Sequence, residues 1–176
     1  MIERWLLMYG VLPAWLAAGV LDWALHRRTR IEANAGLRES LLHMLMLAEM
    51  GAAVLAVLWL QVDALVFGFC VAVFVLHEAT VYADLRWAVP RRPIGPVEQM
   101  VHSFQELLPL AGLALLLSAS WEPLRSALDV RGAAWPPRLK AEPLPPAYLV
   151  AAHAAGMLVF ACYAEELWRC QRARRR

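Results

Sequence analysis

Five long apolar runs divide the chain, and short polar connections separate most of them. A helix that crosses a bilayer needs about 20 mostly apolar residues. The runs of this length predict helices over residues 5–25, 38–60, 64–86, 97–119 and 147–168. Prolines crowd the longest connection, 120–146, and predict extended or irregular backbone there. The pattern indicates an all-α, polytopic membrane bundle that forms one domain over residues 1–176.

The composition supports a membrane protein. The chain is 61% hydrophobic and 18% charged, whereas a soluble domain is typically about 45–50% apolar and about 25% charged. The first run resembles a signal peptide in position only. Glu3 beside Arg4 gives no net positive flank, and the run continues to Asp22 without a clean cleavage site. We therefore expect a retained membrane helix at the N-terminus.

The arginines predict the orientation of the bundle. They gather in the connections 27–37 and 87–96 and in the tail after residue 168. The positive-inside rule places these segments in the cytoplasm, with the N-terminus and the loop 120–146 outside. We expect an integral protein of a bacterial cytoplasmic (inner) membrane, surrounded by the lipid bilayer and without a nucleic-acid partner.

Each of the first four predicted helices carries a histidine and a carboxylate on one face. The pairs are Asp22 with His26, Glu39 with His43, Glu98 with His102, and His77 with Asp84. The first three pairs are four residues apart and the last is seven apart, so each pair shares a helix face. At 1.5 Å per residue, all eight side chains fall within a slab about 10 Å thick on the predicted cytoplasmic side.

Ionisable groups are costly in an apolar setting unless they find partners, a metal ion or water. Antiparallel helices with inward-facing histidines and carboxylates are how bundles build sites for two metal ions. Imidazole combined with carboxylate suits iron, manganese or zinc. We therefore expect all eight residues to bind two divalent metal ions, iron in preference to zinc or manganese, about 3.5–4 Å apart.

Other polar residues are expected around the ligands, as second-shell groups or substrate contacts. They are Glu78, Tyr82, Arg86, Arg91, Arg92 and Glu106. Glu78 points about 100° away from His77, whereas Glu106 extends the stripe of Glu98 and His102. The arginines lie at headgroup level, where they would contact anionic lipid or a phosphate or carboxylate of a substrate.

Two further ionisable residues within the runs are assigned other roles. Glu49 lies deeper in its helix and off the stripe of His43, so we expect it to take part in helix packing. His153 lies in the fifth helix near the predicted outer face, and we expect it to lie apart from the metal ligands.

The arrangement over residues 20–106 resembles two groups of metalloproteins. It is similar to the di-iron carboxylate four-helix proteins, the ferritin-like group, which supply carboxylates and histidines from four helices. It is also similar to membrane-bound hydroxylases and desaturases, which place histidine-rich sites at the cytoplasmic ends of their spans. The ExxH step of the first group and the HxxxH and HxxHH boxes of the second are absent here. The resemblance implies an architecture and no particular family.

The chemistry favours a metal-dependent membrane oxidoreductase or oxygenase. We expect a di-iron enzyme that acts on a lipid-soluble substrate and receives electrons from a donor protein, with no catalytic residue beyond the metal ligands. A zinc-dependent membrane hydrolase, in which a metal-activated water attacks an ester or amide, is the second hypothesis. A b-type cytochrome with paired histidine ligands is a third, and a metal transporter or assembly protein is a fourth.

The topology can be tested with single cysteines at two loop positions. A cysteine that replaces Arg30 should react with a membrane-impermeant maleimide only from the cytoplasmic side. A cysteine at Arg138 should react only from the outer side. Labelling of intact cells and of inverted vesicles measures both. Reaction of position 138 from the cytoplasmic side alone would contradict the predicted topology.

Overall fold

The computed structural model describes residues 2–122, 124 and 137–175. Within these residues the chain is helical, and Leu60 and Leu139 form an isolated β-bridge. The elements are α1 (Ile2–Leu6), the π-helical η1 (Leu7–Val11), α2 (Leu12–Thr29), the short 3-10 helix η2 (Ile31–Ala33), α3 (Gly36–Trp59), α4 (Ala64–Ala88), α5 (Pro96–Ala119) and α7 (Pro146–Arg174).

Five helices are long and apolar enough to cross a membrane, as the sequence predicted. The first consists of α1, η1 and α2 and runs without a break from Ile2 to Thr29. It is longer than the predicted 5–25, and α7 likewise continues to Arg174 rather than to residue 168. Both extensions contain several arginines, which favour helix. The predicted bounds followed the apolar residues, which mark the part of a helix that can enter lipid. Both helices continue past this part into polar residues.

Capping residues and turns fix the ends of the helices. Asp63 caps α4, where its Oδ1 accepts a hydrogen bond of 3.0 Å from the Val66 backbone. Arg30 (φ 55°) ends α2 in the left-handed conformation, and Gly36 (φ 67°) begins α3 in the same region. These two residues reverse the chain within a short connection. Of the predicted irregular loop 120–146, residues 137–145 are non-helical as expected, whereas residues 121, 122 and 124 are helical. Its residues 123 and 125–136 lie outside the described part.

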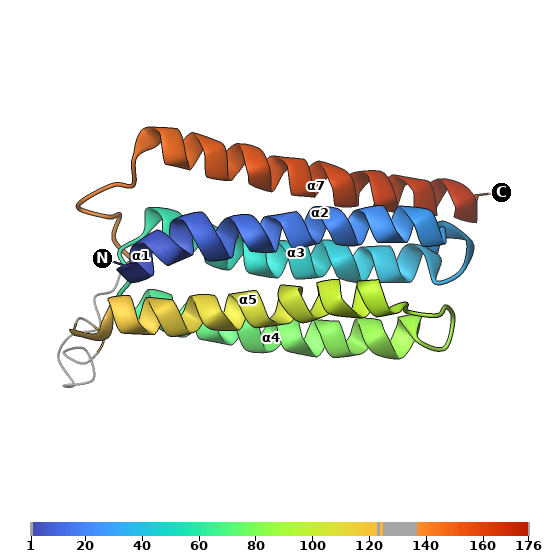
Figure 1. The fold of residues 1–176 in the computed structure, drawn as a ribbon, viewed down its shortest axis with the longest axis horizontal. Coiled ribbons are helices and arrows are strands. Elements are labelled where there is room, and N and C mark those ends of the chain that lie inside the picture. The colour runs from blue at the N-terminus through green and yellow to red at the C-terminus, as the bar shows by residue number, and fades with distance from the viewer. Residues whose placement is uncertain (1, 123, 125–136, 176) are drawn as a thin grey trace.

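The helices form a ring in which α7 is a full member. Each helix packs against two neighbours, in the order α2, α7, α3, α4, α5 and back to α2. In Figure 1, α7 lies along α2 and α3, on the side away from α4 and α5. Gly19 permits the approach of α2 to α7, since a Cβ there would lie 3.4 Å from Cγ1 of Val159. The fifth helix therefore takes part in the interior of the bundle.

The arginine-rich segments share one end of the bundle. The connections 30–35 and 89–95 and the C-terminus lie at one end of Figure 1. The N-terminus and residues 137–145 lie at the other end. We call the former the basic end. This distribution agrees with the alternation that the positive-inside rule requires, while the insertion itself stays a prediction.

The bundle has a polar interior and an apolar exterior. Buried positions include Asp22, His26, Glu39 and Glu166, all less than 4% exposed. Large apolar side chains point outwards, and Val75 and Leu107 are 62% and 60% exposed. A soluble protein rarely exposes so much contiguous apolar surface. This distribution suits a protein whose outer face is covered by lipid.

Candidate metal centre

Two stacked histidine rings lie at the centre of the polar interior. His26 of α2 and His43 of α3 have ring centroids 4.6 Å apart and ring planes 9° from parallel. Glu166 of α7 joins them, with Oε2 3.0 Å from His26 Nδ1 and Oε1 2.8 Å from His43 Nδ1. A carboxylate only accepts hydrogen bonds, so each ring donates through Nδ1. In the neutral form, each Nε2 then keeps its lone pair for a cation.

Four residues of α2 and α5, which we call the α2–α5 group, gather around Nε2 of His26. They are Asp22, His26, Glu98 and His102, and their ligand atoms all lie within 4.8 Å of one another. His26 Nε2 lies 3.2 Å from Glu98 Oε1 and 3.4 Å from Asp22 Oδ1. His102 Nε2 lies 3.0 Å from Asp22 Oδ1. Ligands bound at about 2.0–2.2 Å to one ion lie roughly 3–3.5 Å apart, so this spacing suits a single metal ion.

A second set, the α3–α4 group, gathers around Nε2 of His43. It contains Glu39 and His43 of α3 and Asp84 of α4. His43 Nε2 lies 3.6 Å from Asp84 Oδ2 and 3.9 Å from Glu39 Oε1. These atoms are more widely spaced than those of the α2–α5 group. The α3–α4 group therefore offers a looser site with three candidate ligands.

Several buried atoms of the two groups lack a hydrogen bond of regular geometry. Among the described residues, these include His26 Nε2, Glu98 Oε1 and Asp84 Oδ1. His26 Nε2 and Glu98 Oε1 lie 3.2 Å from each other, and Glu98 Oε1 also lies 2.6 Å from Arg92 Nη2, but neither contact has regular hydrogen-bond geometry. Buried polar atoms without hydrogen bonds are uncommon and call for an ion or a water molecule. Two of these atoms, His26 Nε2 and Glu98 Oε1, are candidate ligand atoms of the α2–α5 group, whereas the Asp84 oxygen nearest to His43 is Oδ2.

Arg92 connects the two groups from the loop at the basic end. The sequence suggested headgroup level for this residue, but its side chain is buried. Its Nη2 lies 2.5 Å from Glu39 Oε1 and 2.6 Å from Glu98 Oε1. Burial opposes the charge of the guanidinium, but the contacts with Glu39 and Glu98 hold the pKa of Arg92 above its ordinary value. Arg92 therefore remains a cation shared by one acid of each group.

The buried charges of this region do not balance. The acids are Asp22, Glu39, Asp84, Glu98 and Glu166, and all are at most 5% exposed. With Arg92 as the cation and neutral histidines, ionised acids leave a formal charge of −4. Uncompensated buried charge is strongly destabilising. Two divalent ions would neutralise it, whereas protonation of His26, His43 and His102 would leave a charge of −1.

His77, the eighth predicted ligand, lies outside both groups. It is buried on α4, nearly two turns from Asp84, and its Nδ1 lies 3.8 Å from Glu49 Oε2. It lines a cavity of about 80 Å³ that borders both groups. Other polar residues of this cavity are Asp22, His43, Asp84, His102, Gln105, Glu106 and Tyr163. The structure thus brings seven predicted ligands together and places His77 on the wall beside them.

The residues expected around the ligands occupy different environments. Glu106 lines the small cavity, and Glu78 is half-buried on α4. Tyr82 is 63% exposed and Arg86 is also exposed, so both face away from the groups. The Arg91 guanidinium stacks on Trp87, 3.2 Å from the ring centroid. Of the three arginines expected near the site, Arg92 is the one that contacts acids of the two groups, Glu39 and Glu98.

The two residues assigned to other roles have contacts of the expected kind. Glu49 accepts a hydrogen bond of 2.8 Å from Thr80 Oγ1 and thereby links α3 to α4. His153 Nε2 accepts a hydrogen bond of 3.3 Å from Trp59 Nε1, seven residues after the start of α7 and apart from the candidate ligands.

Sequence reasoning missed two residues of α7. Glu166 holds both histidines, and the Tyr163 hydroxyl donates a hydrogen bond of 3.0 Å to Asp22 Oδ2. The predicted topology already placed the acids of "YAEELWR" at the depth of the other carboxylates. Glu165 and Glu166 are adjacent, however, and only the orientation of α7 shows which faces inwards. Glu165 instead pairs with Arg27 at 2.7 Å and with Arg169 at 3.0 Å.

No protein-family model matches the chain, and no curated protein or solved structure is significantly similar to it.

Glu166→Gln tests whether this carboxylate orients the two histidines. Loss of such a partner typically weakens metal affinity about 10–100-fold, and we expect a decrease of this size. Glu165→Gln removes the neighbouring acid, which faces away from the rings, and should leave the affinity unchanged. Metal titration of both purified variants measures the effect. Equal affinities for the two variants would contradict the role of Glu166.

His77→Ala and His102→Ala distinguish the cavity wall from the ligand groups. We expect His102→Ala to remove an ion from the α2–α5 group, because His102 supplies one of its four ligand atoms. We expect His77→Ala to retain the full metal content, because His77 belongs to neither group. Elemental analysis of both variants provides the comparison. Loss of metal from His77→Ala alone would show that the ligand sets are wrong.

Proposed function

We propose that the chain is a membrane-embedded oxidoreductase that binds two divalent metal ions, iron in preference to zinc or manganese. One observation carries the proposal. Glu166 holds Nδ1 of both His26 and His43, which leaves one imidazole Nε2 for each acidic group. A carboxylate behind a metal-bound histidine is the usual arrangement in metal sites. Here a single carboxylate would serve two such histidines.

The ligand types are compatible with iron. Imidazole and carboxylate donors without thiolate also suit zinc and manganese, but inward-facing carboxylates and histidines from several helices are the donors of the di-iron bundles. The α2–α5 group would hold one ion and the α3–α4 group the other. Together the ions would supply oxidation by O₂ at the small cavity. Conversion of a C–H bond to an alcohol by O₂ also consumes an electron pair and a pair of protons from a donor protein and releases water.

A second, apolar cavity supports a lipid-soluble substrate. This larger cavity, of about 560 Å³, is lined mainly by apolar side chains. Trp15 lines both it and the small cavity at the two groups. A molecule that enters from the bilayer would therefore reach the vicinity of the candidate ligands through an apolar space.

A zinc-dependent hydrolase remains the second candidate. Catalytic zinc sites use three protein ligands and an open position, as the α3–α4 group would provide. His77 and Glu106 line the adjacent cavity and would act there as proton acceptors. The identity of the bound metal and its spectrum separate the two candidates.

The packing argues against a b-type cytochrome. The rings of His26 and His43 stack 4.6 Å apart, which leaves no room for a porphyrin between them. The cavity beside both groups, about 80 Å³, is far smaller than the roughly 300 Å³ at the lower end of ligand sites.

The metal content tests the proposal directly. Protein purified without chelators should contain close to two metal ions per chain, mainly iron, because two ions neutralise the formal charge of the buried groups. Elemental analysis gives the count, and near-ultraviolet absorption identifies oxo-bridged iron by its charge-transfer bands. A single metal ion per chain, or none with the histidines protonated instead, would refute the proposal. Two zinc ions would favour the hydrolase.

A further inference from the structure

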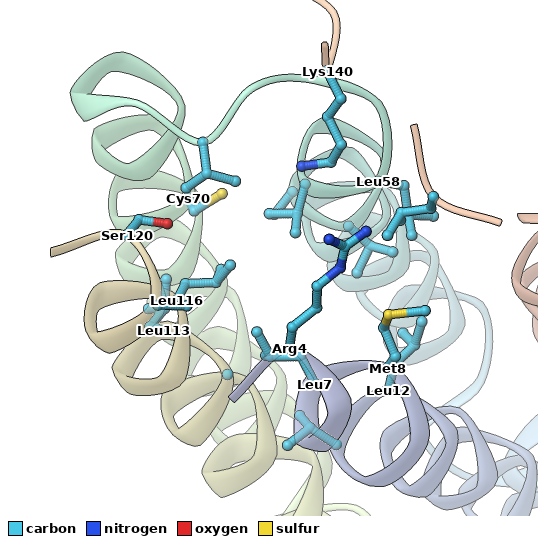
Figure 2. Close-up of a pocket in the computed structure, with 18 of the residues that line it drawn as sticks. Arg4, Leu7, Met8, Leu12, Leu58, Cys70, Leu113, Leu116, Ser120 and Lys140 are labelled. Atoms are coloured by element: carbon cyan, nitrogen blue, oxygen red, sulfur yellow. The ribbon is translucent and has the colours of Figure 1, made fainter. Parts of the chain in front are cut away.

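The larger cavity lies towards the end of the bundle opposite to the basic end. It is lined by residues of α1, η1, α2, α3, α4 and α5 and by the segment 140–148. Its volume of about 560 Å³ falls within the range of roughly 300–1,000 Å³ that is usual for small-molecule sites. Figure 2 shows leucines from several elements around it, with Met8 and Cys70.

Two cationic side chains point into this apolar space. Arg4 enters from α1 and Lys140 from the segment after residue 137, and Figure 2 shows that they extend towards each other. Neither forms an ion pair with another residue in the described part of the chain. Glu142 also lines the cavity; Arg4 and Glu142 are both exposed, whereas Lys140 is half-buried. This end of the cavity therefore carries two cations and one acid, a formal charge of +1.

The charge environment of Lys140 favours the binding of an anion in the cavity. Burial and the nearby charge of Arg4 lower the pKa of Lys140 from its ordinary value. Both effects disfavour the ammonium form. An anion between Arg4 and Lys140 would offset the repulsion and form charge-assisted hydrogen bonds with both groups.

The remainder of the cavity suits a long apolar chain. From the cationic end it extends along the first helix to Trp15. Arg4 and Trp15 lie eleven residues apart in one continuous helical segment, which corresponds to about 16 Å. Beyond Trp15 lies the small cavity with His77 and Glu106. A molecule held by its charged end would thus direct its chain towards the candidate metal centre.

We propose that this cavity binds a single-chain anionic amphiphile, with its carboxylate or phosphate between Arg4 and Lys140 and its apolar chain directed towards Trp15. The identification of this amphiphile as the substrate rests on the function proposed above. Its binding does not, since Arg4 and Lys140 belong to neither metal-ligand group.

The test uses the purified full-length protein in detergent and a palmitate analogue with a photoreactive diazirine at the chain end. Labelling should saturate and map to cavity residues near Trp15. Palmitate and hexadecyl phosphate should compete, and the stronger competitor identifies the headgroup. Hexadecanol has the same chain without the charge and should compete at least about tenfold more weakly. Equal competition by hexadecanol would overturn the proposal.

Variants test the two cations. The double substitution Arg4→Gln with Lys140→Gln should weaken binding of the analogue by about tenfold or more. Arg138→Gln is the matched control, because Arg138 is an exposed cation of the same segment that does not line the cavity. Undiminished binding by the double variant would refute the assignment of the headgroup site.

The metal content separates this inference from the proposed function. The double variant should keep the metal content of the unsubstituted protein, which also shows that it is folded. If the unsubstituted protein binds palmitate selectively but contains no metal ion, the amphiphile site stands and the proposed oxidoreductase fails. If the protein contains two ions but shows no preference for the anion, the oxidoreductase stands and the amphiphile site fails.

Discussion

Five carboxylates buried together around His26 and His43 are the constraint on which the rest of the interior depends. Each must meet a positive charge, a hydrogen-bond donor or a proton, because an unpaired charge at low dielectric is too costly to keep. Three of the carboxylates, Asp22, Glu39 and Glu98, have a histidine four residues further along the same helix as a partner. Arg92 meets another part by folding into the bundle from the basic end and contacting Glu39 and Glu98. The remaining negative charge is what makes a metal centre the favoured explanation.

The fifth helix gives this interior its symmetry. Since α7 packs between α2 and α3, Glu166 contacts one histidine from each side. Its two oxygens bind equivalent ring nitrogens and orient the opposite nitrogens towards separate acidic groups. A four-helix site would lack this shared carboxylate. The five-helix ring therefore differs from the four-helix architecture that the sequence resembled, although the ligand types are the same.

The sequence predicted the features that depend on local periodicity. Apolar runs gave the five helices, and four-residue steps gave faces such as Asp22 with His26. Features set by packing could not be read in this way. The orientation of α7 decides between Glu165 and Glu166, and the course of the loop 89–95 buries Arg92 instead of leaving it at the surface. His77 shares a face with Asp84, but lies too deep in α4 to reach the same group.

The bundle combines this polar half with an apolar cavity, and Trp15 borders both. The central claim is that two metal ions lie in the polar half, one beside each histidine. Anomalous X-ray diffraction at the iron edge, from crystals of protein purified without chelators, tests it most directly. The account predicts two peaks, one within the α2–α5 group and one within the α3–α4 group. The absence of peaks, or a single peak at any position, would contradict it.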